Sequence, residues 1–257
     1  MMENNYNPWL EILAQTDKKT YSQNQEAFSD LKNLQTFCNT TIAAGGGFAA
    51  TGMFLNPVLG LVGGFVSLTI IELSKPVDRL VSVMEDLLKI DGIIVTPRIK
   101  TDKGTIDLLV KMPDRRRFAF ALRSKLNSRI KWRKEDQNFF AITPRKGRAP
   151  RAKRWPDLLE LGKNLNESII SLNKQKSYLL GANNSELRLP VVKAIALTST
   201  TTVDPTNDPD LFVDFGATRV LKVQSGCTMH VLEQRDIIKF LEKVNKRPIL
   251  GDYMSKP

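Results

Sequence analysis

Two runs of alternating side chains within the stretch 104–125, at 105–110 and 118–125, predict neighbouring β-strands. Side chains alternate between the two faces of a strand. Asp107 therefore lies on one face of the first strand, and Arg123 and Lys125 share a face of the second with small alanines. The pattern predicts a hairpin that carries charged side chains close to its apolar residues.

The rest of the chain supplies helices and further strands around this hairpin. Apolar residues at intervals of three and four predict helices, and short apolar runs predict strands. The expected helices cover residues 8–37, 76–89, 156–173 and 236–244, and the expected strands cover 93–100, 191–198, part of 212–223, and 228–232. This order predicts an α/β fold with a mixed sheet between helices, the αβββαβ order, preceded by a helical N-terminal region and an apolar helical hairpin.

Residues 33–71 contain no charged side chain. A membrane-spanning helix needs about 20 apolar residues, and Asn56-Pro57 near the middle of the run is a turn signal. The run therefore predicts two short helices that form a membrane hairpin over residues 37–74. Gly60 and Gly64 form a GxxxG pair, which permits helix association and a homo-oligomer. A Gly-rich buried hairpin of a soluble protein, or an interfacial segment, remains an alternative.

The charges that flank this run indicate its orientation. Lys75 and Arg79 follow it closely, and positive residues favour the cytoplasmic side of a membrane. We therefore expect a polar N-terminal helical region at 1–36, the membrane segment at 37–74, and a cytoplasm-facing domain at 75–257.

Positive charge is concentrated in one segment. The chain has a formal net charge of +11, and residues 111–154 hold sixteen lysines and arginines against three acidic residues. Such a segment, with interleaved tryptophans that can stack on bases, predicts binding to nucleic acid, with DNA favoured. A basic loop that binds anionic lipid or an acidic partner is the alternative. The candidate contact residues are Arg115, Arg116, Arg117, Arg129, Lys131, Trp132, Arg133, Lys134, Arg145, Lys146, Arg148, Arg151, Lys153 and Arg154.

The predicted hairpin, with Asp107 in one strand and Lys125 at the end of the next, resembles the core of the restriction-endonuclease-like PD-(D/E)xK superfamily, and within it the nuclease-related (NERD) domain. The resemblance implies metal-assisted phosphodiester cleavage, in which two carboxylates hold Mg²⁺ and the lysine positions and polarises the attacking water. Arg123 stands where the family has glutamate, and an arginine adds charge where the metal belongs. We therefore expect a nuclease-like domain that binds nucleic acid and whose catalysis is degenerate.

Two other interpretations of the same residues stay open. In the first, Glu85 replaces the missing carboxylate and holds Mg²⁺ with Asp107, which gives an active nuclease. In the second, the chain is a non-catalytic membrane scaffold whose basic loop binds anionic lipid or an acidic partner. For Asp107 by itself, a structural ion pair with Lys125 or Arg123 is the alternative to a role in metal binding.

The remaining residues that often carry chemistry form no recognisable site. His230 is the only histidine, and a lone histidine in a short strand is expected to be packed or hydrogen-bonded. Cys38 and Cys227 lie too far apart in sequence to indicate a zinc motif or a disulfide framework.

Overall fold

The computed structural model describes residues 24–55, 57–114, 116–174, 191–215 and 218–243, and gives only the helical backbone for 48–55, 57–67, 69, 72, 73, 173 and 174. The described chain divides into two compact units. Residues up to Glu85 form the first, which is helical, and residues from Asp86 onward form the second, which contains all the strands.

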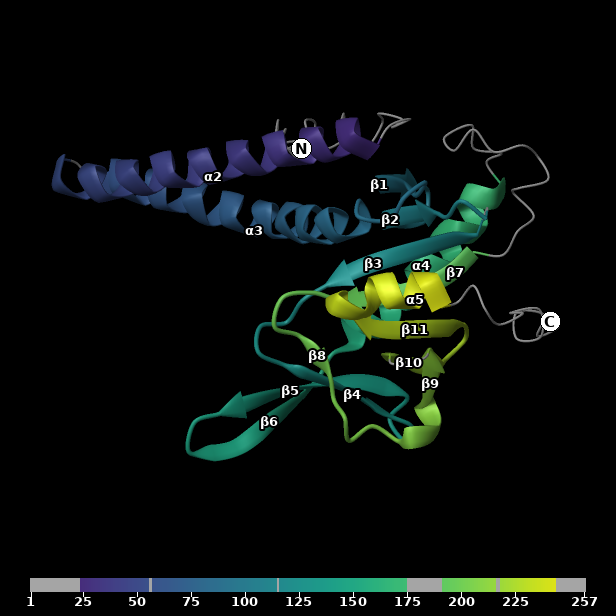
Figure 1. Ribbon diagram of the computed structural model, residues 1–257. Helices are drawn as coiled ribbons and strands as arrows, with labels where there is room; N and C mark the ends of the chain where they lie inside the picture. The colour runs from purple at the N-terminus through teal and green to yellow at the C-terminus, as the bar shows by residue number, and fades with distance from the viewer. Residues whose placement is uncertain (1–23, 56, 115, 175–190, 216–217, 244–257) are drawn as a thin grey trace, which may run out of the picture. The chain divides into compact units, whose positions relative to one another are not determined.

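The helical unit is a pair of long helices, α2 (Asn24–Leu55) and α3 (Pro57–Leu87), which run side by side (Figure 1). Gln35 of α2 donates a hydrogen bond to Asp78 of α3 at 2.8 Å, and a second contact joins Lys32 to Glu85 at 2.9 Å. With 32 and 31 residues, both helices are longer than the two short helices that the sequence predicts, and Asn56, between them, lies outside the described residues.

Pro76 lies inside α3, whereas the sequence predicts a helix that begins there. Proline fits the first turn of a helix best, but a long helix continues past it when its other contacts outweigh one lost hydrogen bond. Among the helices of the described residues, none combines the length and the apolar character that a membrane crossing requires.

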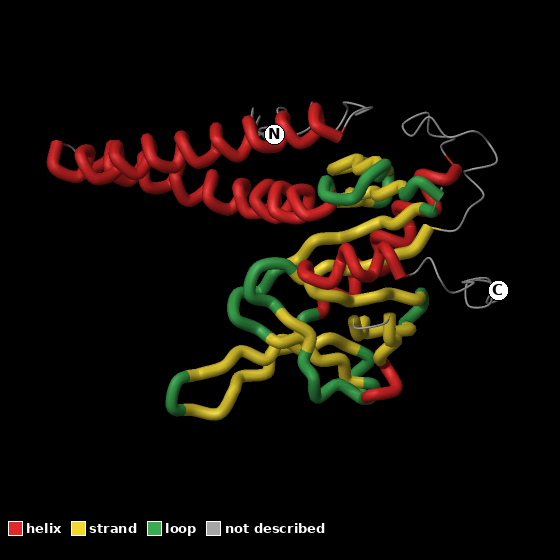
Figure 2. Tube along the Cα trace, viewed as in Figure 1, coloured by secondary structure: helices red, strands yellow, loops and turns green. Residues whose placement is uncertain are grey.

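The second unit is built on a seven-stranded mixed sheet (Figure 2). Its strands, in spatial order, are β1 (Ile94–Thr101), β2 (Gly104–Lys111), β3 (Arg117–Arg123), β7 (Val191–Leu197), β11 (Thr228–Glu233), β10 (Thr218–Gln224) and β9 (Phe212–Phe215). The first three form an antiparallel meander, β3, β7 and β11 are parallel to one another, and β10 and β9 complete the sheet in antiparallel pairs. The α/β class predicted from the sequence is confirmed.

Helices cover both faces of this sheet. The apolar face of α4 (Pro156–Lys174) packs on alanines of β3 and aliphatic residues of β1 and β2 through Leu165, Ile169 and Leu172. On the opposite face, Phe240 of α5 (Ile237–Lys243) contacts the ring of Phe118 in β3, with centroids 5.9 Å apart. Both faces of the central strands are therefore buried, as their continuous apolar sequence requires.

A second, four-stranded sheet packs on the same face of the large sheet as α4, next to the N-terminal end of that helix. Its spatial order is β6 (Arg148–Arg154), β5 (Asn138–Arg145), β4 (Arg129–Arg133) and β8 (Thr202–Val203). Buried residues of β4 and β5 share one core with Trp155 and Leu158 and with residues of β7, β10 and β11. The sequence predicts none of β4, β5 and β6 as strands, although these strands contain most of the basic segment.

Candidate nucleic-acid interface and the Asp107 site

Asp107 is held by two donors from the neighbouring strand. Its Oδ2 accepts a hydrogen bond from the backbone N–H of Leu122 at 2.7 Å and lies 3.0 Å from Nη1 of Arg123. The same Nη1 donates to the carbonyl oxygen of Leu122 at 2.7 Å. Arg123 therefore links β2 and β3 through a small hydrogen-bond network. Of the two partners that the sequence offers Asp107 for a structural ion pair, Lys125 and Arg123, the structure shows Arg123.

Lys125 lies apart from this network. Its Nζ sits 4.9 Å from the centroid of the Trp155 ring, which is a cation–π contact. Its backbone is fixed by Thr201, whose hydroxyl accepts from the N–H of Lys125 at 2.6 Å and donates to its carbonyl oxygen at 2.9 Å. Burial, and then the nearby charge of Lys153, lower the pKa of Lys125, while Asp157 opposes the shift.

The residues around Asp107 do not fit a Mg²⁺ ion. Mg²⁺ requires several oxygen ligands at about 2.1 Å, but the carboxylate of Asp107 is already engaged by a guanidinium. Glu85, the expected second ligand, belongs to the helical unit, where it pairs with Lys32. Within the described residues, no three His, Cys, Asp or Glu side chains gather in a way that could hold a metal ion.

In β4 of the second sheet, apolar side chains lie on the face towards the core and charged side chains on the opposite face, because successive side chains alternate. Ile130 and Trp132 of β4 face the core, so Arg129, Lys131 and Arg133 face outward. The Trp132 ring is 6% exposed and packs against Phe139 with centroids 4.8 Å apart. The structure therefore places in the core a tryptophan that the sequence suggests as a base-stacking residue.

The basic residues differ in their availability to a ligand. Arg115 lies outside the described residues. Arg116 pairs with Asp114 at 2.7 Å, Arg117 is only 2% exposed, and Lys134 pairs with Asp208 at 2.5 Å. Arg116, Arg117 and Lys134 therefore contribute little free positive charge.

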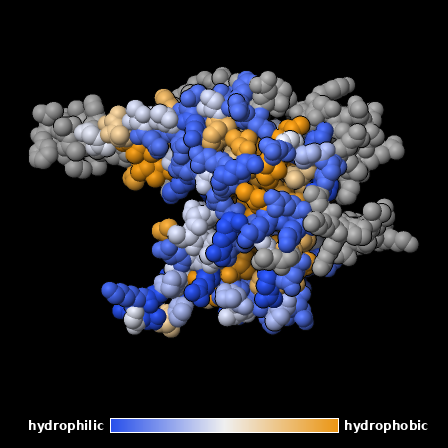
Figure 3. Space-filling model, viewed as in Figure 1, coloured by the Kyte–Doolittle hydropathy of each residue, from blue (hydrophilic) through white to orange (hydrophobic). Residues whose placement is uncertain are grey.

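Strand β6 carries the most accessible positive charge. All seven of its residues are exposed, and it forms one edge of its sheet. Figure 3 shows the hairpin of β5 and β6 as a largely hydrophilic projection. Among the contacts of the described residues, no acidic side chain pairs with the basic residues of this hairpin, which are Arg145, Lys146, Arg148, Arg151, Lys153 and Arg154.

The buried side chain of Asn207 forms hydrogen bonds with the backbone of β4. The Asn207 side chain accepts from the N–H of Trp132 at 2.8 Å and donates to the carbonyl oxygens of Ile130 at 3.1 Å and Asp204 at 2.7 Å. It thus satisfies part of the backbone of β4 next to the short strand β8. The sequence gives no sign of this role, because Asn207 lies in a polar stretch that predicts only a loop.

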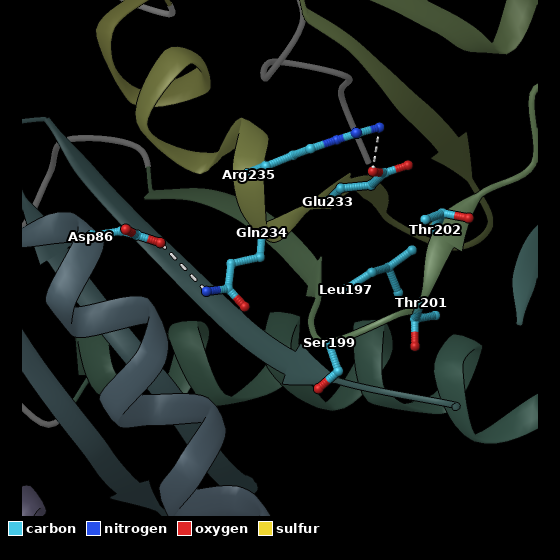
Figure 4. Close-up of a pocket in the computed structure, with 8 residues that line it drawn as sticks. All are labelled: Asp86, Leu197, Ser199, Thr201, Thr202, Glu233, Gln234 and Arg235. Carbon is cyan, nitrogen blue, oxygen red and sulfur yellow. Dashed lines mark hydrogen bonds and ion pairs between the residues drawn. The ribbon is translucent and has the colours of Figure 1, made fainter. Parts of the chain in front are cut away.

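A pocket of about 310 Å³ lies at the carboxyl ends of β7 and β11 (Figure 4). This edge of an open α/β sheet is where ligands commonly bind. Both carboxylates of its lining already have partners: Glu233 pairs with Arg235 at 2.8 Å, and Asp86 accepts from Gln234 at 3.4 Å. The surface of its lining is more apolar than polar, and its two carboxylates and one guanidinium give no concentration of a single charge. Its lining residues are Asp86, Leu197, Ser199, Thr201, Thr202, Glu233, Gln234 and Arg235.

His230 is packed against aromatic rings, and neither Cys38 nor Cys227 forms a disulfide. His230 is 6% exposed, its Nδ1 lies 3.2 Å from the carbonyl oxygen of Lys193, and its ring lies beside those of Phe215 and Phe240. Both cysteines are free thiols, and burial raises the pKa of Cys227. This arrangement does not assemble a nucleophile–base pair around His230.

Comparisons with family models, curated proteins and solved structures find no match. The resemblance to the PD-(D/E)xK superfamily therefore rests on the residues and on their arrangement alone.

Proposed function

We propose that this chain binds nucleic acid, DNA in particular, through the sheet formed by β4, β5 and β6. The observation that carries the proposal is the edge strand β6, which is exposed along its whole length and carries four cations, Arg148, Arg151, Lys153 and Arg154. Cations on a rigid, projecting strand can contact successive phosphates and displace their counterions. The outward-facing Arg129, Lys131 and Arg133 of β4 extend the same positive surface.

We also propose that the second unit is a restriction-endonuclease-like domain whose catalysis has degenerated. Support comes from three antiparallel strands that are followed, after the intervening strands β4–β6, by a helix and a strand parallel to the third, with Asp107 in the second strand. Arg123 favours loss of activity, because its guanidinium engages the carboxylate that the family uses for Mg²⁺. An active nuclease is the alternative, in which a carboxylate from elsewhere completes the site.

Membrane attachment through residues 37–74 is the third part of the proposal, and the charge-free run at 33–71 supports it. A hairpin there would place residues 75–257 in the cytoplasm. The full chain should float with liposomes, and Leu61→Lys, which puts a charge into the apolar run, should abolish flotation. Flotation that survives Leu61→Lys and is lost in high salt would instead indicate binding of anionic lipid by the basic sheet.

The binding proposal is tested by salt titration of the full chain with a fluorescent DNA. Arg148→Gln/Arg151→Gln/Arg154→Gln should weaken binding by at least ten-fold at low salt and make the dependence of log K on log[salt] shallower. The matched control is Lys103→Gln/Lys239→Gln/Lys243→Gln, which removes three exposed charges from other surfaces of the same unit. Equal losses in both triple variants, or wild-type binding that ignores salt, would contradict a specific role for β6.

A further inference from the structure

We infer that the outer face of the second sheet binds single-stranded nucleic acid and that Phe140 is its base-stacking residue. The inference rests on the proposed nucleic-acid binding and names the form of nucleic acid and the residue that contacts a base. It starts from strand parity. Phe139 is fully buried in the core, so Phe140, the next residue of β5, must point to the opposite, outward face.

The neighbours of Phe140 on that face are cations. In the sheet register, Lys131 of β4 lies opposite it on one side and Arg154 of β6 on the other. Residues that face each other across strands have Cβ atoms about 5 Å apart. A half-buried aromatic ring is therefore flanked on both sides by positive side chains that project from the same surface.

Arg133 adds a second flat group beside this ring. Its guanidinium carbon lies 4.2 Å from the centroid of Phe140, a cation–π contact. Arg133 is only loosely tied elsewhere, since its Nη1 lies 3.8 Å from Asp136. The ring and the guanidinium together offer planar surface on which an unpaired base can stack, with cations placed for the phosphates on either side.

This arrangement discriminates between forms of nucleic acid. In a duplex, the faces of the bases are stacked on one another, so an aromatic ring on the protein gains little. In a single strand, each base exposes a face, and base–aromatic stacking strengthens binding on the order of ten-fold or more per base. An apolar ring between cations adds nothing to the binding of phosphates alone, whereas it adds a stacking surface for the bases of a single strand.

The test compares three ligands of equal length with the full chain at one salt concentration: a single-stranded DNA, the same sugar–phosphate strand without bases, and the corresponding duplex. The abasic strand keeps every phosphate, so it isolates the contribution of the bases. Wild-type protein should bind the single strand on the order of ten-fold more tightly than the abasic strand. Phe140→Leu should bring that ratio close to one without changing affinity for the abasic strand.

Two further variants separate stacking from folding. Phe140→Trp keeps a flat ring and should retain the preference, whereas Ile142→Ala removes an apolar side chain from the same face of β5 and should leave it unchanged. A ratio near one in wild-type protein, or a ratio unaffected by Phe140→Leu, would overturn the inference while salt-dependent binding upheld the proposed function. Tighter binding to the duplex would also overturn it and would point to insertion of the β5–β6 hairpin into a groove. No binding to any of the three would contradict the proposed function itself.

Discussion

The guanidinium of Arg123 lies 3.0 Å from the carboxylate of Asp107, across the boundary between β2 and β3. Both side chains retain some solvent exposure, so the contact lies at the margin of the core. The residue that departs from the nuclease pattern thus pairs with the residue that would hold the metal. Among the described residues, this pair both links β2 to β3 and leaves the Asp107 carboxylate without a fit to Mg²⁺.

A glutamate at position 123 should create some metal binding. Arg123→Glu places a second carboxylate beside Asp107, so the variant should be less stable than wild type without metal and should regain stability with Mg²⁺. At a Mg²⁺ concentration ten times the dissociation constant, the gain is roughly 1.4 kcal/mol, which thermal unfolding can detect. Wild type and Arg123→Gln should show no such response.

A cleavage assay with the wild-type chain tests the active-nuclease alternative. Cleavage of DNA by the wild-type chain that requires Mg²⁺ or Mn²⁺ and is lost in Asp107→Ala would show that Arg123 does not prevent catalysis. A carboxylate from another segment would then have to complete the site.

The regular elements of the large sheet were predictable because their residues follow a single rule. The alternation in 105–110 and 118–125 and the leucine face of 156–173 each reflect burial on one side of an element. The predicted bounds agree with β2 and α4 within about one residue, but β3 ends at Arg123, so Lys125 lies beyond the strand in which the sequence places it. The partner of Asp107 was predictable only as a choice between two cations, because the reach of a long side chain depends on the strand register.

The second sheet was not predictable in the same way. The alternation of two buried residues with three cations in β4 does fit a strand, but it spans only five residues of a segment whose composition is dominated by positive charge, and in β6 every residue is exposed. A strand without a buried face leaves no periodic pattern, so residues 148–154 resemble a loop in sequence. The role of Phe140 was hidden for a related reason: composition draws attention to Trp132, and only the register shows which aromatic ring faces outward.

Gly162 of α4 should resist replacement because of one neighbour. A Cβ at this position would lie 1.7 Å from Sδ of Met229, which is 1% exposed. Gly162→Ala should therefore destabilise the fold by about 1–3 kcal/mol through overpacking, despite the better helix propensity of alanine. In a Met229→Ala background the clash is gone, and the same change should stabilise by up to about 1 kcal/mol.

Urea unfolding of the four proteins in this double-mutant cycle measures the coupling between the two positions. Additive effects of the two substitutions would show that Gly162 is not kept small by Met229.

Asn207 should matter more for stability than its place in a loop suggests. Asn207→Ala leaves the buried N–H of Trp132 without its acceptor and removes two donated hydrogen bonds, which should cost about 2 kcal/mol or more. Asn207→Asp keeps an acceptor but turns a carboxylate toward two carbonyl oxygens, so its stability should improve as acid protonates it. Gln224→Ala, at an exposed amide, is the control and should change stability by no more than about 0.5 kcal/mol.

Asp208 should titrate at lower pH than an ordinary aspartate. The hydrogen bond from Lys134 at 2.5 Å, and then that from the N–H of Asp210 at 3.1 Å, lower its pKa. A carboxyl with a lowered pKa in the folded state stabilises the fold above its unfolded pKa of about 3.9, and this contribution is lost as pH falls through the folded value. NMR titration of Lys134→Gln should show the pKa of Asp208 rising towards normal, while Lys146→Gln leaves it unchanged.

The same pairing predicts unequal roles for the basic residues in binding. Because Asp208 already balances the charge of Lys134, Lys134→Gln should weaken DNA binding much less than Arg151→Gln, although each removes one positive charge from the basic segment. The affinities of both variants for one fluorescent DNA at low salt test this expectation. Equal losses of affinity would mean that the whole segment attracts DNA only through its summed charge. A larger loss in Arg151→Gln would mean that the unpaired cations of β6 contact the phosphates directly.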